Sequence, residues 1–144
     1  MAISDSAAGL LGTWRLESLR LRMEDTGDIV EPFGPDPRGS IIFTPDGRMM
    51  TVITASRRAP PTTETETTAA FRGMMAYTGR FTVERDRVVT EVDAAWNPAW
   101  EGTRQVRIAK LEGDRLTLTS EVQGHPLYPG RKLRGIMVWA RQTS

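Results

Sequence analysis

The sequence predicts an all-β fold: a closed, antiparallel, up-and-down barrel of eight strands with one short helix between strands 3 and 4. Short segments of alternating apolar and polar residues recur at regular spacing, which is typical of barrels and sandwiches. The connections also alternate in length. Tight turns are expected at 46–47, 85–86 and 113, and long connections at 25–37, 55–75, 96–102 and 123–131. Because consecutive strands run in opposite directions, all the long connections meet at one end of a barrel whose interior can hold side chains or one small ligand.

The first strand is expected at 12–24, and its apolar residues change parity between Leu16 and Leu19. A β-bulge near Glu17-Ser18 brings both sets to the same face, because one extra residue reverses the alternation. Trp14 then lies at the end with the short turns. The last strand ends there too, and we expect the Arg141 guanidinium to stack on the Trp14 indole.

The remaining elements follow from alternation and turn residues. A helix is expected from Thr62 to Met75, because acidic residues follow a threonine in the manner of a capping motif. Its buried stripe would be Ala69, Ala70, Phe71, Met74 and Met75. The other seven strands are expected at 39–45, 48–54, 76–84, 87–95, 103–111, 115–122 and 132–142.

The composition narrows the class of protein. A chain of 144 residues suits a single domain, 1–144. Its 19 basic and 18 acidic residues leave no basic footprint of the kind that binds nucleic acid. The chain contains no cysteine, which suits the cytoplasm, and we expect no signal peptide and no membrane partner. With one histidine and no cysteine, no metal site is expected, and no cofactor motif is found.

Polar residues expected to face the interior are candidates for holding a ligand. A two-residue turn at 85–86 would pair Tyr77 with position 94 and bring Arg104 to the same level, near the long connections. Arg104 shares its parity with Val106 and Ile108, so we expect it to point inward and bind a carboxylate or enolate oxygen. Alternatively, Arg104 extends into solvent or pairs with Glu101.

Two hydroxyl groups and the histidine are weaker candidates. Thr90 and Ser120 should point inward, where they either orient a ligand or hydrogen-bond backbone groups. His125 is the only histidine, so it is either a general base at the mouth or a solvated side chain. Tyr128, in the same long connection, is expected to contact the ligand. Glu91 and Asp93 are expected outside, in water.

Aromatic and apolar side chains gather on the long connections. Trp96 and Trp100 would stack on a flat ligand, cap the barrel or form the interface of a homodimer. Phe71 and Met74 of the helix would cover the same mouth.

The sequence resembles the bacterial lipocalin-like domain family, small calycin-type barrels, along nearly its whole length. The matching stretches are Leu11-Gly-Thr-Trp-Arg-Leu16, Pro32-Phe-Gly-Pro-Asp-Pro-Arg-Gly39, Phe43-Thr-Pro-Asp-Gly47, Ala76-Tyr-Thr-Gly-Arg-Phe81, Asn97-Pro-Ala-Trp-Glu-Gly-Thr103, Gly113-Asp-Arg-Leu-Thr-Leu118 and Val138-Trp-Ala-Arg141. The resemblance implies a barrel with a pocket for a small, mostly apolar molecule, but no single activity. Members often carry a histidine pair where this chain has Thr90-Glu91, so a metal or base role for that pair does not carry over.

We therefore expect the protein to bind a small apolar or aromatic molecule inside the barrel, with Tyr77 and Arg104 at its polar end. The alternative is a cofactor-independent enzyme, such as an isomerase, cyclase or lyase, that uses the same pocket. In that case Tyr77, Arg104 or His125 would move a proton or stabilise an oxyanion.

Overall fold

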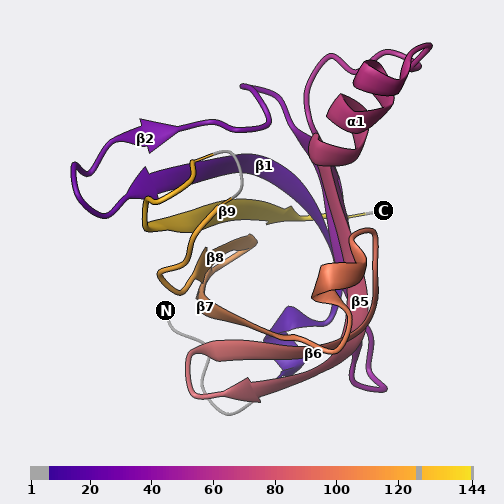
Figure 1. Ribbon diagram of the computed structural model, residues 1–144. Coiled ribbons are helices and arrows are strands. Elements are labelled where there is room, and N and C mark those ends of the chain that lie inside the picture. The colour runs from indigo at the N-terminus through magenta and orange to yellow at the C-terminus, as the bar shows by residue number, and fades with distance from the viewer. Residues whose placement is uncertain (1–6, 126–127, 144) are drawn as a thin grey trace.

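A computed structural model describes residues 7–125 and 128–143 and shows a sheet that curls round until its ends meet (Figure 1). The strands are β1 (Gly12–Met23), β2 (Ile29–Val30), β3 (Arg38–Phe43), β4 (Arg48–Thr54), β5 (Met74–Glu84), β6 (Arg87–Ala95), β7 (Arg104–Glu112), β8 (Arg115–Ser120) and β9 (Leu133–Arg141). The helices are α1 (Glu64–Arg72) and two 3-10 turns, η1 (Ala8–Leu10) and η2 (Pro98–Trp100).

The sheet closes into an antiparallel barrel. The strands follow one another in the order β1, β3, β4, β5, β6, β7, β8, β9, and β9 pairs back onto β1 from Trp14↔Arg141 to Met23↔Leu133. The two-residue strand β2, which the sequence did not predict, only adds to the far end of β1. The predicted fold class, eight long strands in a closed barrel with α1 between the third and fourth, is therefore confirmed.

The bulge predicted in β1 is present. The pairing of β1 with β9 shifts register between Leu16 and Ser18. Trp14, Leu16, Leu19 and Leu21 are consequently all buried, although they differ in parity. The bulge lets one long strand line the barrel interior from the closed end to the mouth.

A second bulge, between Thr78 and Gly79 of β5, was not predicted. It pairs Tyr77 with Ala95, so the expected pairing of Tyr77 with position 94 is wrong by one residue. Gly79 permits this approach, because a Cβ atom there would collide with the carbonyl oxygen of Glu91. The bulge thus depends on a residue without a side chain.

The helix is shorter than expected and lies outside the core. The Thr63 side chain accepts a hydrogen bond from the Glu66 N–H at 3.1 Å, which caps the first turn. The helix ends at Arg72, because the next residues pair with β4 and begin β5. All residues of α1 are at least partly exposed, so the expected buried stripe is wrong for the helix itself. Figure 1 shows α1 at the start of β5, beside the barrel mouth.

The opposite end of the barrel is sealed. Trp14 is completely buried, and its indole N–H donates to the carbonyl oxygen of Leu10 at 2.9 Å. The Arg141 guanidinium lies 4.2 Å from the centroid of the Trp14 ring, as predicted, and donates to the carbonyl oxygens of Leu11 and Gly9. The apolar core above it includes Phe43, Phe81, Leu116 and Trp139.

Candidate functional site

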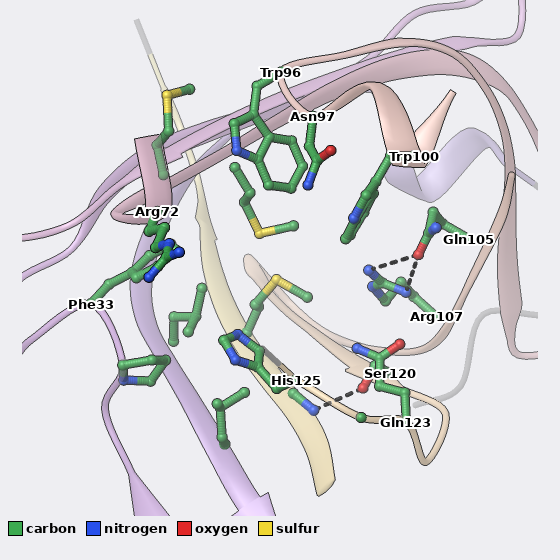
Figure 2. A pocket seen from close by; sticks show the side chains of 18 of the residues that line it. Phe33, Arg72, Trp96, Asn97, Trp100, Gln105, Arg107, Ser120, Gln123 and His125 are labelled. Atoms are coloured by element: carbon green, nitrogen blue, oxygen red, sulfur yellow. Dashed lines mark hydrogen bonds between the residues drawn. The ribbon is translucent and has the colours of Figure 1, made fainter. Parts of the chain in front are cut away.

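The barrel contains a cavity of about 460 Å³ at the end with the long connections (Figure 2). That volume lies within the range of small-molecule pockets, about 300–1,000 Å³. Strands β1, β5, β7, β8 and β9 contribute its walls, and the loops after β2, β6 and β8 together with the end of α1 form its mouth. The walls are largely apolar and aromatic, with Phe33, Phe71, Trp96, Trp100 and Met137 among them.

Three of the mouth aromatics contact one another in a chain. The ring centroids of Trp96 and Trp100 are 5.1 Å apart, and those of Phe71 and Trp96 are 6.3 Å apart. The Trp96 indole N–H donates to the carbonyl oxygen of Phe71 at 3.3 Å, which connects α1 to the loop after β6. The structure therefore brings together four of the residues expected at the mouth, Phe71, Met74, Trp96 and Trp100.

The strongest polar feature of the cavity is Arg107 of β7. Its side chain lines the cavity, yet the residue is only 6% exposed. Nη1 donates to the carbonyl oxygen of Val106 at 3.0 Å, and both Nη atoms lie 3.5 Å from Oε1 of Gln105. Nε has no hydrogen-bond partner, and no carboxylate of the described residues lies within 4.0 Å of the guanidinium. A buried cation without a counter-ion is energetically costly.

The predicted inward orientation of Arg104 is wrong. Its side chain is 55% exposed, and it pairs across the outer surface with Glu84 at 3.5 Å and Glu91 at 3.3 Å. The inward positions of β7 are those of Gln105, Arg107 and Ala109, opposite in parity to the expected set. Arg104 also pairs with Glu91 in the sheet, so it is not level with Tyr77.

Three other residues expected to face the interior, Tyr77, Thr90 and Ser120, are all buried. Tyr77 is buried, with its ring 5.3 Å from that of Trp100, but it is not a cavity-lining residue, and neither is the buried Thr90. Ser120 does line the cavity, and its hydroxyl accepts from the Gly135 N–H at 2.7 Å and donates to the carbonyl oxygen of Glu121. Of the two roles considered for Ser120, the structure thus displays backbone hydrogen bonding.

His125 lines the cavity and is half-buried. Burial lowers the pKa of its imidazole from the ordinary value of 6.5, so the ring is neutral at neutral pH. Its ring lies 5.9 Å from that of Tyr128, which itself packs beside Leu21, Met23 and Leu133 rather than lining the cavity.

Sequence reasoning missed Phe33, Gln105 and Arg107. The segment holding Phe33 reads as a loop because of its glycine and prolines. Phe33 is nevertheless buried, and its carbonyl oxygen accepts hydrogen bonds from both the N–H and the hydroxyl of Ser56. Arg107 was missed because β7 carries apolar residues on both faces, so alternation alone could not decide which face is inside. Ala109, a small residue on the same face of β7 as Arg107, was the sequence feature that could have indicated the inward face.

Within the described ranges, no three His, Cys, Asp or Glu side chains are grouped so that they could hold a metal ion. No helix found there is long and apolar enough to cross a membrane.

A closed antiparallel barrel with an aromatic-walled cavity at one end is the architecture of small-molecule-binding β-barrels. The chain belongs to the lipocalin-like domain family, whose model matches residues 11–142. It is also similar to the 4'-hydroxy-3'-methoxypropiophenone carrier protein of Aspergillus oryzae, with 35% identity over 88 residues, covering 55% of this chain and 77% of the relative. The fold and this relative together support binding of a small molecule in general terms.

Proposed function

We propose that this protein binds a small, largely aromatic molecule inside the barrel, and that the molecule enters through the mouth formed by the long connections. The observation that carries the proposal is Arg107, a buried guanidinium that faces an aromatic-walled cavity and has no counter-ion among the described residues. A ligand oxygen on Arg107 would supply the missing partner, and the mouth aromatics would stack on the ring.

The similar protein of Aspergillus oryzae is named as the carrier of a molecule with one aromatic ring, a phenol, a methoxy group and a ketone. Such a molecule combines the two features that the cavity would recognise, a flat ring and oxygen acceptors. We therefore propose phenolic aromatic compounds of this size as ligands of the present protein, with binding and release, rather than turnover, as its activity.

Calorimetric titration with 4'-hydroxy-3'-methoxypropiophenone tests this proposal. The wild-type protein should bind the compound, and Arg107→Met should weaken binding about tenfold or more, since a hydrogen bond to a charged group contributes roughly 1.5–3 kcal/mol. The matched control is Arg104→Met, which removes the same side chain from the outer face of the same strand and should leave the affinity unchanged. Equal affinity of all three proteins would remove Arg107 from the site.

A cofactor-independent isomerase, cyclase or lyase in the same cavity is a second candidate. It is favoured by one observation: a neutral imidazole, that of His125, lines the same cavity as a guanidinium. His125 would take a proton, and Arg107, in place of the expected Arg104, would stabilise the resulting oxyanion. Chemical change of a bound ligand that stops in His125→Asn would support this candidate. Recovery of the ligand unaltered after prolonged incubation would exclude it for that compound.

A cytoplasmic location and a homodimer through Trp96 and Trp100 are also part of the proposal. The absence of cysteine favours the first. The partial exposure of both indoles supports the second, although each also lines the cavity. Cell fractionation and sedimentation at high protein concentration test them. A monomer at every concentration would exclude the dimer.

A further inference from the structure

We propose that the ligand is an anion, held by its carboxylate on Arg107: an aromatic carboxylic acid in its ionised form. This inference rests on the proposed function, because it names the chemical class of the molecule that occupies the same cavity. It goes further in that it predicts selection for charge, which a cavity for neutral aromatic compounds would lack.

The charge of the cavity walls favours an anion. They include two arginines, Arg72 and Arg107, and within the described residues no aspartate or glutamate. Arg72, in the last turn of α1, is exposed at the mouth, while Arg107 is buried deeper in the barrel. Figure 2 shows both guanidinium groups among the aromatic side chains. An anion would thus meet a positive charge at the entrance and a second one inside, with no acidic wall residue to repel it.

The Arg107 donors that have no partner among the described residues also favour a carboxylate. A guanidinium has five N–H donors in a fixed planar arrangement. The carbonyl oxygen of Val106 accepts a hydrogen bond from one N–H of Nη1. Gln105 Oε1 lies 3.5 Å from both Nη atoms and therefore faces the edge that these two atoms share. The Nε–H and the second N–H of Nη2 remain, and these two point the same way along one edge. Two parallel donors match the two oxygens of a carboxylate better than the single oxygen of a ketone or phenol.

Gln105 occupies the neighbouring edge, the one between the two Nη atoms. Its Nε2 donates to Thr103 Oγ1 at 2.9 Å, and the Thr103 hydroxyl donates to the carbonyl oxygen of Trp100. This chain holds the amide oxygen of Gln105 toward Arg107. Because Nε is enclosed, a carboxylate reaches it only if the guanidinium turns slightly, and the 3.5 Å contacts to Gln105 are too long to oppose that turn strongly.

The buried charge of Arg107 also makes an anionic ligand energetically favourable. A neutral amide oxygen and a carbonyl oxygen are the only hydrogen-bond acceptors that Arg107 has within the described chain, so its charge is not compensated. A neutral ligand would leave that charge buried and would also cover it further. A carboxylate would compensate it at the moment of binding, so the larger gain on binding belongs to the anion.

Titration with cinnamate and cinnamamide above pH 7 tests the inference, because the two compounds share ring and chain and differ in charge. The wild-type protein should bind cinnamate at least about tenfold more tightly, the smallest preference expected for one charge-assisted contact. The decisive variant is Gln105→Glu, which places a permanent carboxylate beside Arg107 at almost unchanged volume. It should abolish the preference for cinnamate over cinnamamide.

The matched control is Gln123→Glu, which adds the same charge to another cavity-lining glutamine that is exposed and does not hydrogen-bond Arg107. It should keep most of the preference for cinnamate. Equal binding of cinnamate and cinnamamide to the wild type, or an undiminished preference in Gln105→Glu, would overturn the inference while the proposed function stands. Failure of both compounds and of the propiophenone to bind would instead refute the proposed function.

Discussion

Arg104 and Arg107 lie three positions apart on β7 and occupy opposite faces of the barrel wall. The Arg104 side chain is 55% exposed between two glutamates, whereas Arg107 is 6% exposed and has no counter-ion among the described residues. An odd separation along a strand places two side chains on opposite faces. One strand therefore carries the same residue in a surface role and in an interior role, which makes the two arginines a matched pair for experiment.

Arg107→Met should leave the free energy of unfolding unchanged or raise it by about 1 kcal/mol or more. Replacing buried charge with an apolar side chain of similar volume removes a desolvation penalty. Urea denaturation of Arg107→Met and Arg104→Met measures the effect. Arg104→Met should be within about 1 kcal/mol of wild type, because exposed ion pairs contribute little. A loss above about 2 kcal/mol in Arg107→Met would show that the guanidinium has a structural role that outweighs its burial.

Trp14→Ala should lower the free energy of unfolding by about 3–5 kcal/mol, as expected for a large-to-small change in a core. Trp14 is fully buried at the closed end, where Arg141 covers its ring. Trp96→Ala at the mouth is the comparison and should have a smaller effect, because that indole is partly exposed. A normally stable Trp14→Ala protein would contradict the assignment of the closed end as the one that stabilises the fold.

The architecture could be predicted because its signals are local. Alternation, turn residues and connection lengths gave the eight strands, the bulge at Glu17-Ser18 and the contact of Arg141 with Trp14. The bulge at Gly79 could not be predicted in the same way. A glycine is needed there because the backbone of Glu91, on the neighbouring strand, lies against it, and that contact is not visible in the local sequence.

The polar centre of the site was misassigned for a related reason. Both faces of β7 carry apolar residues, so parity did not show that Arg107 rather than Arg104 faces inward. The mouth residues Phe71, Met74, Trp96 and Trp100 were correctly expected to lie together, because long connections at one end of a barrel must converge. Whether they bind a ligand stays a prediction.

Ligand binding should quench the fluorescence of the mouth tryptophans and leave the core tryptophans unaffected. Trp96 and Trp100 line the cavity, whereas Trp14 and Trp139 are buried in the core outside it. The ligand-induced change should therefore largely disappear in Trp96→Phe/Trp100→Phe and persist in Trp139→Phe. Persistence of the full change in the double variant would place the ligand away from the mouth.

His125 should make the protein less stable as the pH falls below about 6.5. Burial lowers the pKa of the folded imidazole below its ordinary value of 6.5, so the unfolded chain binds more protons in that window and stability decreases with decreasing pH.

The difference in unfolding free energy between wild type and His125→Asn, measured from pH 8 to pH 5, isolates this contribution. The pairing of Arg48 with Asp93 lowers the carboxyl pKa below its ordinary value of 3.8, so its effect falls at lower pH. A difference that does not vary with pH would show that the imidazole titrates normally.

The central claim is that a small aromatic ligand occupies the barrel cavity with an oxygen on Arg107. A crystal structure of the protein with bound cinnamate tests it most directly. We predict the ring beside Trp96 and Trp100, and carboxylate oxygens within about 3.2 Å of the Arg107 nitrogens. A ligand found on the outer surface of the barrel, or in the cavity with its carboxylate turned away from Arg107, would contradict the account.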